Sequence, residues 1–362
     1  MKIAILTINS FYNYGNRLQN FALHTFLKSL NSNIEVETIW CDKNRHKKER
    51  IYFVNKVYDL LTNVFGDFSK KCFNKYKRQA NLKLFTDKYI RTSYEYGFKD
   101  ELDKKYDYFI IGSDQIWNPH WVNNNDIFLG CVSPNKRISF AASFGVSEIP
   151  IDKTEYFKNG LNGMAHISVR ENAGAKIVKA LTGKEVSVVL DPTLTLKGEQ
   201  WSKFCQKPVW YTKEKYILVF FLSKLPDLAR IEIERIAEEN NFKIIDLMNE
   251  SKKDYYTSSP EEFLFLIRNA VLVYTDSFHC TVFSILFNVP FVNCSRENAG
   301  MNMDSRMDTL LGLFGMQDRK TDKSKNYTVI NPLKLKYPDV EKILESEREK
   351  ARQYLLKALG MK

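Results

Sequence analysis

The sequence predicts an α/β protein of two domains, each built on a parallel β-sheet. Three observations lead to this prediction. Short apolar segments alternate with helix-like segments along nearly the whole chain, which is the pattern of parallel strands joined by helices. The 362 residues exceed the roughly 250–300 at which one hydrophobic core stops growing, so two cores are expected. Polar clusters directly follow several apolar segments, and ligands of such sheets bind at the carboxyl ends of the strands.

The first half of the chain contains six strand-like segments. They are short and apolar, and they lie at residues 2–8, 36–40, 108–111, 138–142, 165–169 and 186–190. Residues 191–215 interrupt the pattern, because they contain two prolines, several turn-forming residues and no long periodic run. We therefore predict an N-terminal Rossmann-like domain at residues 1–195 and a linker after it.

The alternation resumes in the second half. Strands are predicted at residues 217–222, 243–247, 271–274 and 291–293, and helices at residues 228–240, 260–268 and 281–287. The first of these helices begins near Pro226 and Asp227, a proline and a capping residue in suitable places. A second Rossmann-like domain is thus expected at residues 196–335. A charged helix that starts at Pro338 and Asp339 completes the chain at residues 336–362.

The net charge of +11 is concentrated in one segment. Residues 43–91 contain 14 Lys and Arg against 4 Asp and Glu, and apolar residues at helical spacing predict a helical insertion of two helices. One stripe runs from Ile51 to Phe68, and a second consists of Phe73, Tyr76, Ala80 and Leu84. The ordinary interpretation is an apolar stripe that faces the core, with a solvated basic face behind it. The functional alternative is a cationic surface with aromatic residues that rests on anionic lipid headgroups. Nucleic acid is not expected, because no recognition signature accompanies the charge.

Several classes of protein are excluded by what the sequence lacks. It has no Gly-x-Gly-x-x-Gly motif after a strand and no Walker loop, so a dinucleotide cofactor or P-loop chemistry is not expected. The six cysteines are scattered without zinc-ligand spacing, which predicts reduced thiols and no metal. No signal sequence or membrane-spanning stretch is visible, so a cytoplasmic protein is expected.

Five polar clusters follow predicted strands and form the candidate site. They are residues 13–19, 112–118, 170–171, 191–192 and 276–279. His279 stands at the start of a helix, where unpaired N–H groups hold anions and an imidazole can move protons; in the alternative, Asp276 or Ser277 only caps the helix. Arg170 can grip a carboxylate or phosphate, or it can stabilise the fold by pairing with Glu171 or Asp191. Arg17 and Arg306 are the next candidate anion ligands.

Taken in order, these motifs resemble the polysaccharide pyruvyl transferase family. The resemblance is carried by residues 13–19, 112–118, 168–171, 191–193, 275–279 and 305–313, and it covers nearly the whole chain. It implies two Rossmann-like halves facing a cleft, as in glycosyltransferase type B. It also implies the transfer of pyruvate from phosphoenolpyruvate, the donor substrate, to a sugar as a cyclic ketal. Several family members have an arginine two residues before the histidine, and this chain has Ser277 there.

The resemblance and the chemistry together assign expected roles. His279 is expected to transfer protons at the phosphate and methylene end of the donor, and Asp114 to act as the base for the sugar; in the alternative, Asp114 only caps a turn. The expected donor-binding residues are Arg170, Ser277, Phe278, His279 and Arg306. The expected acceptor-binding residues are Asn13, Asn16, Arg17, Gln19, Gln115, Trp117 and Asn118, of which Trp117 stacks on the sugar or belongs to the core.

Two rival functions remain open at this stage. A nucleotide-sugar glycosyltransferase would share the two-domain shape and would need an acidic residue such as Asp276 or Glu297 to hold a ribose. A non-enzymatic partner of a polysaccharide assembly complex would need neither Arg170 nor His279. For the enzyme, the basic segment suggests a lipid-linked oligosaccharide acceptor at the inner face of the membrane, used for a capsule, exopolysaccharide or cell-wall polymer.

Overall fold

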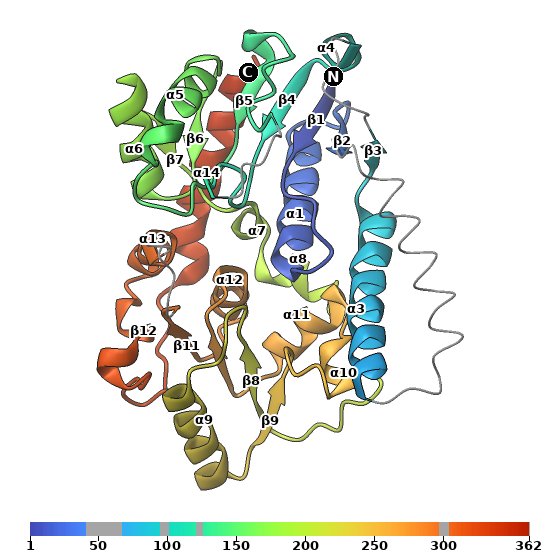
Figure 1. Ribbon diagram of the computed structural model, residues 1–362, viewed down its shortest axis with the longest axis vertical. Helices are drawn as coiled ribbons and strands as arrows, with labels where there is room; N and C mark the ends of the chain where they lie inside the picture. The colour runs from blue at the N-terminus through green and yellow to red at the C-terminus, as the bar shows by residue number, and fades with distance from the viewer. Residues whose placement is uncertain (41–66, 95–100, 121–125, 297–303, 362) are drawn as a thin grey trace.

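The computed structural model describes residues 1–40, 67–94, 101–120, 126–296 and 304–361, and these form two α/β domains (Figure 1). The first predicted helix of the basic insertion and Glu297 lie outside the described residues. Each domain contains a five-stranded sheet in which every pair of neighbouring strands is parallel. The α/β prediction with two Rossmann-like domains is therefore confirmed.

The first sheet has the strand order β3-β2-β1-β4-β5. Its strands are β1 (Lys2–Leu6), β2 (Glu35–Trp40), β3 (Thr92–Tyr94), β4 (Tyr108–Ile111) and β5 (Arg137–Ser139). A short parallel pair, β6 (Ser168–Val169) and β7 (Ser187–Val188), continues beyond β5 through bridges at Ile138–His166 and Ala142–Val169. The central strands read as uninterrupted apolar runs because helices cover both faces of a parallel sheet.

The second sheet has the order β12-β11-β10-β8-β9. Its strands are β8 (Tyr216–Phe220), β9 (Lys243–Asp246), β10 (Leu272–Thr275), β11 (Phe291–Cys294) and β12 (Lys320–Thr321). All of them lie within the range predicted for the second domain. β10 is fully buried at the centre of the sheet, and the helix that carries His279 follows it.

Helices connect the strands and cover the sheets. In the first domain they are α1 (Tyr14–Leu30), α3 (Asp67–Tyr89), α4 (Glu101–Lys105), α5 (Thr154–Asn162) and α6 (Asn172–Thr182). The short helices α7 (Pro192–Thr195) and α8 (Gly198–Ser202) lie in the predicted linker. The remaining helices are α9 (Asp227–Asn240), α10 (Lys253–Tyr256), α11 (Pro260–Arg268), α12 (Phe278–Leu286), α13 (Asp304–Phe314) and α14 (Val340–Ala358).

Helix boundaries follow local capping chemistry. Asn13 caps α1 by accepting a hydrogen bond from the Gly15 N–H at 2.9 Å. Ser259 and Glu262 form a capping box at α11, with Pro260 as its first residue. Asp339 caps α14 by accepting from the Lys342 N–H at 3.1 Å. The starts of α11 and α14 agree with the sequence-based boundaries because the capping residues can be recognised in the sequence.

The C-terminal helix α14 returns to the first domain. Its Ala351 and Leu355 pack in a core cluster that also contains Ile3, Ile5 and Phe140. The Tyr354 hydroxyl donates to the Ser139 carbonyl oxygen at 2.7 Å. Burial raises the pKa of this tyrosine, which keeps the hydroxyl neutral and able to donate. The chain thus crosses between the domains both at the linker and through α14 (Figure 1).

Helix α3 links the two domains from the side. It belongs to the segment between β2 and β3, yet it lies beside α10 and α11 of the second domain (Figure 1). The Arg78 guanidinium donates to the carbonyl oxygens of Leu247 at 3.2 Å and Tyr256 at 2.8 Å, and the Asn74 amide donates to that of Glu250 at 2.9 Å. Polar side chains therefore form much of this interface.

The predicted apolar stripe on α3 is wrong. Phe73 and Leu84, two of its members, are 38% and 64% exposed. The buried residues of the helix are instead Asn74, Arg78, Leu82, Phe85 and Thr86. The apolar periodicity predicted the wrong buried face, because the face of α3 that packs on the second domain carries Asn74 and Arg78. These side chains donate hydrogen bonds to carbonyl oxygens of that domain.

The two domains share one hydrophobic cluster. Tyr14, Leu18 and Phe21 of α1 pack in the same cluster as Phe263, Phe283 and other residues of the second domain. Trp201 of α8 fills the space between them and packs edge-on against Phe21 and Phe283, with ring centroids 5.6 and 5.0 Å apart. Side chains of both domains thus fill the interface where the carboxyl ends of the two sheets face each other.

Candidate active site

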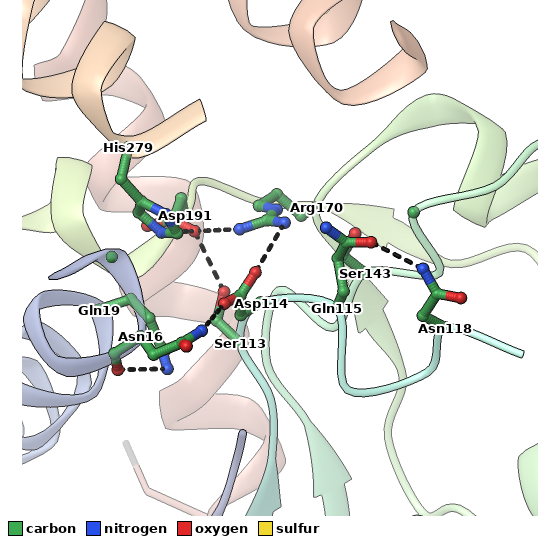
Figure 2. A network of polar contacts seen from close by, with 12 residues as sticks. Asn16, Gln19, Ser113, Asp114, Gln115, Asn118, Ser143, Arg170, Asp191 and His279 are labelled. Carbon is green, nitrogen blue, oxygen red and sulfur yellow. Dashed lines mark hydrogen bonds and ion pairs between the residues drawn. The ribbon is translucent and has the colours of Figure 1, made fainter. Parts of the chain in front are cut away.

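Residues from all five predicted clusters converge at the interface between the two sheets. Figure 2 shows Asn16 from α1, Asp114 after β4, Arg170 after β6, Asp191 before α7 and His279 in α12 within one polar network. These five side chains are all at least 90% buried. Short loops after five different strands position them, so chain segments far apart in sequence assemble one site.

Arg170 lies among three carboxylates. Its Nη1 donates to Asp191 Oδ2 at 2.6 Å, its Nη2 is 3.6 Å from Asp114 Oδ1, and its Nε is 3.9 Å from Glu171 Oε2. Burial disfavours the charged guanidinium, but Asp191, Asp114 and Glu171 outweigh burial and raise the pKa of Arg170. Nε and Nη2 have no hydrogen-bond partner among the described residues. The arginine is therefore anchored on one side and retains free donors on another.

Asp191 connects the arginine to the histidine. Its Oδ1 caps α7 by accepting from the Thr193 N–H at 3.0 Å and the Thr193 hydroxyl at 2.6 Å. Its Oδ2 accepts from Arg170 and from the Ser113 hydroxyl at 3.2 Å, and it lies 3.6 Å from His279 Nε2. Burial works against ionisation, but His279 and Arg170 lower the pKa of Asp191 well below its usual range. Sequence reasoning placed Asp191 only as a partner of Arg170, although the Asp-Pro pair after a strand marks its capping position.

His279 begins α12 and faces the first domain. Its Nε2 has no hydrogen bond among the described residues, since the 3.6 Å separation from Asp191 exceeds hydrogen-bond distance. The ring packs against α1, where a Cβ built on Gly15 would lie 2.1 Å from Nδ1. Gly15 is thus required by close approach of the imidazole. The opening of α12 and the opening of α1 meet at this point.

Asp114 is held in a tight turn after β4. Its φ of 58° lies in the left-handed region, where Asp and Asn are favoured over other non-glycine residues. Its carbonyl oxygen accepts from the Ser143 N–H at 2.9 Å, and its Oδ2 accepts from the Asn16 side-chain amide. The carboxylate is thereby presented between Asn16 and Arg170. Figure 2 shows Asp114 and Asn16 in the same polar network as His279.

Arg306 and Phe278 enter from the second domain. The Phe278 ring lies 4.4 Å from the Arg170 guanidinium carbon and 5.9 Å from that of Arg306, so the aromatic ring contacts both cations. Burial and then repulsion from Arg170 lower the pKa of Arg306 to about 10. With the Gln115 amide turned, its oxygen accepts from Arg306 Nη1 at 2.8 Å and Nη2 at 3.1 Å. In the part of the chain that the structure describes, Arg306 makes no ion pair with a carboxylate.

Glu171 is a site residue that sequence reasoning treated only as a partner for Arg170. Its Oε1 accepts from the Ser143 hydroxyl and the Phe144 N–H, both at 2.9 Å, and from the Gly145 N–H at 3.3 Å. It thus fixes the loop after β5 beneath the arginine. Nothing local distinguishes this glutamate, so only its neighbour Arg170 could have marked it.

Arg17, Gln19 and Asn13 line the start of α1. Arg17 is fully buried, and its Nη2 donates to the Ile8 carbonyl oxygen at 2.7 Å and to Asn9 Oδ1 at 3.1 Å. Burial lowers its pKa to about 9, although the Asp114 carboxylate acts in the opposite direction. Gln19 donates to the Thr7 hydroxyl at 2.9 Å and to the Asn16 carbonyl oxygen at 3.1 Å, so it supports the loop. Asn13 is the α1 cap.

Two predicted acceptor ligands belong to the structural core, and for them the prediction is wrong. Trp117 is fully buried in a hydrophobic cluster, 5.3 Å from both Phe128 and Phe144 between ring centroids. Asn118 is also fully buried and closes a turn: its Oδ1 accepts from the His120 N–H at 3.0 Å, and its side-chain amide lies 2.7 Å from that of Gln115. An aromatic ring and an amide beside a site motif look the same in sequence whether they face a ligand or the core.

Ser277 and Asp276 directly precede α12. The sequence predicts the Ser277 hydroxyl as a donor ligand and, in the glycosyltransferase alternative, the Asp276 carboxylate as a ribose ligand. The Ser277 hydroxyl accepts from the Cys280 N–H at 3.4 Å and caps α12. Asp276 uses both oxygens: Oδ1 accepts from the Leu222 N–H at 2.6 Å, and Oδ2 accepts from Ser223 and lies 3.0 Å from Arg296 Nε. Both carboxylate oxygens are therefore occupied, and Asp276 is poorly placed to hold a ribose.

Among the described residues, no cluster of three or more His, Cys, Asp or Glu side chains has the arrangement of a metal site. Among the described helices, none combines the length and the apolar character that crossing a bilayer requires.

Comparison with solved structures returns proteins that span nearly the whole chain at low identity. The UDP-GlcNAc 2-epimerase of Methanocaldococcus jannaschii, in complex with UDP-GlcNAc and UDP, is 13% identical with a TM-score of 0.49, and 99% of each chain is covered. The E. coli ADP-heptose lps heptosyltransferase II is 9% identical with a TM-score of 0.37, over 99% of this chain and 98% of that one. No curated protein matches the chain. The family model described as polysaccharide pyruvyl transferase matches residues 13–298, and the chain therefore belongs to that family.

Proposed function

We propose that this protein transfers the pyruvyl group of phosphoenolpyruvate to two hydroxyls of one sugar, as a cyclic ketal. One observation carries the proposal: Asp191 joins the Arg170 guanidinium of one domain to the His279 imidazole of the other, at 2.6 and 3.6 Å, beside the Asp114 carboxylate. Guanidinium groups and proton-transfer groups thus lie together at the carboxyl ends of both sheets. Phosphoenolpyruvate needs both kinds of group.

The donor would be held by the arginines near Phe278. Arg306 is buried without a carboxylate partner among the described residues, and Arg170 retains two guanidinium nitrogens with no hydrogen bond there. A phosphate and a carboxylate can each accept paired hydrogen bonds from a guanidinium. The start of α12 adds backbone donors and a partial positive charge. In this scheme Arg306 supplies the positive charge that several family members obtain from an arginine at the position of Ser277.

Addition of the first hydroxyl to the donor needs two proton transfers, and Asp114 and His279 are the groups proposed to make them. A sugar hydroxyl attacks C2 of the donor while Asp114 takes its proton, and His279 gives a proton to the methylene carbon, which becomes a methyl group. A second hydroxyl of the same sugar then attacks C2 and gives its proton to His279, while phosphate leaves with its C–O bond electrons and takes the proton held by Asp114. The sugar loses two hydroxyl hydrogens, one of which is balanced by the new methyl hydrogen and the other by the released phosphate. General acid or base help contributes roughly 10²–10⁴-fold for each group.

Substrate entry would require the domains to separate slightly. His279, Arg170, Asp191 and Asp114 are at most 7% exposed, so phosphoenolpyruvate cannot reach them in this arrangement. Closure around the substrates would exclude water, which would otherwise compete with the sugar hydroxyl at C2. The acceptor would lie over the α1 side, where Asn16 contacts Asp114.

The test is phosphate release from phosphoenolpyruvate with a panel of nitrophenyl and lipid-linked glycosides, with mass spectrometry to detect the added pyruvyl group. His279→Gln and Arg306→Gln should lose turnover. Arg235→Gln is a matched control, because that guanidinium is half-exposed and its ion pairs with described residues are to Glu232 and Glu239 of its own helix. Activity with sugar nucleotides and none with phosphoenolpyruvate, across the whole panel, would remove the proposal.

We further propose that the acceptor is a lipid-linked oligosaccharide at the inner membrane face. It would serve the synthesis of a capsule, exopolysaccharide or cell-wall polymer. Its support is the basic segment, of which Lys71 and Lys77 are exposed on α3. Each basic residue near an anionic surface contributes about 1 kcal/mol, so flotation with anionic vesicles should be salt-sensitive. The double reversal Lys71→Glu with Lys77→Glu should weaken flotation. The control double reversal, at the exposed Lys176 and Lys184, should leave flotation unchanged. If both double reversals weaken flotation equally, α3 is not the membrane-binding surface.

A further inference from the structure

We infer that the buried guanidinium of Arg17 binds an oxyanion carried by the acceptor, so the acceptor is an anionic glycan bearing a phosphate or a carboxylate. The inference rests on the proposed function for identifying the ligand as a sugar acceptor. It adds the chemical class of that acceptor and the residue that selects it.

Arg17 differs from Arg170 in how its charge is neutralised. Arg170 has three carboxylates within 3.9 Å, whereas Arg17 makes no ion pair among the described residues. Only its Nη2 is bonded, to the Ile8 carbonyl oxygen and Asn9 Oδ1, while Nε and Nη1 have no partner in the described part of the chain. A fully buried cation with two unused donors is costly unless a ligand supplies the missing charge.

The surroundings of Arg17 suit a sugar with an attached anion. The guanidinium carbon lies 5.8 Å from the Phe11 ring and 5.9 Å from the Trp40 ring, and these two rings are 5.2 Å apart. Both rings are partly exposed at the carboxyl ends of β1 and β2. Aromatic faces at such an edge can pack on a sugar ring while the guanidinium binds its charged substituent.

The position relative to the reactive groups fixes which substrate is concerned. Arg17 follows Asn16, whose side-chain amide bonds the Asp114 carboxylate proposed as the acceptor base. The site lies at the beginning of the 17-residue helix α1, which adds its own partial positive charge. An anion bound by Arg17 would therefore sit close to the sugar that receives the ketal, and away from Arg306 on the donor side.

The loop over Arg17 allows access with little cost. Residues 8–13 have no helix or strand structure, and Tyr12 is 68% exposed. The loop is held by few bonds, among them that from the Asn9 amide to the Ile39 carbonyl oxygen at 3.2 Å. A small outward shift of this loop would expose Nε and Nη1 to the ligand.

The experiment measures acceptor binding without phosphoenolpyruvate, so it does not depend on whether pyruvyl transfer occurs. Titration calorimetry compares a methyl hexoside, the hexose 1-phosphate and a methyl hexuronide, which distinguish a phosphate from a carboxylate. Wild-type protein should bind one or both anionic sugars roughly 10- to 100-fold more tightly than the neutral one, as expected for a charge-assisted pair. Arg17→Gln should abolish this preference and leave the neutral sugar unaffected.

Arg306→Gln is the matched control, because it removes a buried guanidinium from the donor side. It should keep the preference for the anionic sugar. Loss in Arg306→Gln with retention in Arg17→Gln would mean that the anion occupies the donor site, and this would overturn the inference, as would absence of any preference in the wild type. Should Arg17→Gln fail to fold, Arg17→Lys replaces it: the preference must then fall several-fold, since lysine lacks the paired donors, and an unchanged preference refutes the inference.

Discussion

The substitution Asp191→Asn tests the charge network most directly. The remaining side-chain oxygen can still cap α7 through Thr193, so the helix start is preserved. The new amide nitrogen would face Arg170 Nη1, which now donates to Oδ2 at 2.6 Å, and a donor would meet a donor. The perturbation therefore removes one buried negative charge and the oxygen that accepts from Arg170 and Ser113.

The expected loss of unfolding free energy depends on the carboxylates that still face Arg170 in the variant. Removing one partner of a buried ion pair costs about 3–5 kcal/mol in unfolding free energy. Asp114 at 3.6 Å and Glu171 at 3.9 Å still face the guanidinium, so the lower end of this range, about 3 kcal/mol, is expected at pH 7. Asp339→Asn is the control, because that carboxylate is an exposed helix cap and asparagine caps almost as well.

The pH dependence gives a second, independent check. The pKa of Asp191 is held below its usual range by His279 and Arg170, against the effect of burial. A lowered native-state pKa means that this stabilisation is complete above the unfolded-state pKa of about 4 and is lost as the pH falls below it. The difference between wild type and Asp191→Asn should therefore shrink by about 1.4 kcal/mol for each pH unit below about 4.

Urea unfolding at pH 7 and at several values between pH 3 and pH 5 measures both effects. An Asp191→Asn protein as stable as wild type at pH 7 would refute the reasoning, because the carboxylate would then not be the anchor of Arg170. A stability difference that stays constant down to pH 3 would contradict the lowered pKa.

Three further substitutions have distinct expected outcomes. His279→Gln should reduce phosphate release from phosphoenolpyruvate by roughly 10²–10⁴-fold in a protein that still folds, and near wild-type turnover would exclude proton transfer by this residue. Gly15→Ala should lower the unfolding free energy by about 1–3 kcal/mol, since its Cβ would lie 2.1 Å from His279 Nδ1; a more stable variant in urea would show that the imidazole is not packed there. Trp117→Phe should lower stability but leave the KM for the acceptor unchanged, because the indole is fully buried. A raised KM would show that the indole contributes to acceptor binding.

Much of the fold could be predicted because its signals are local. The strand at residues 271–274 and the helices at residues 228–240 and 260–268 agree with the observed elements to within one residue, since apolar periodicity and capping residues determine them. The stripe on α3 was misassigned because its buried face contacts carbonyl groups of the other domain. Periodicity reports apolar contacts, and polar contacts between domains are invisible to it.

The same distinction explains the site. The sequence by itself determined that His279, Arg170 and Asp114 follow strands, and parallel sheets then bring such positions to one edge. Only the tertiary structure decided that Asp191 joins Arg170 to His279, that Arg17 is buried without a carboxylate among the described residues, and that Trp117 faces the core. Ion pairing and burial depend on distances between segments that are far apart in the chain, and no local pattern encodes those distances.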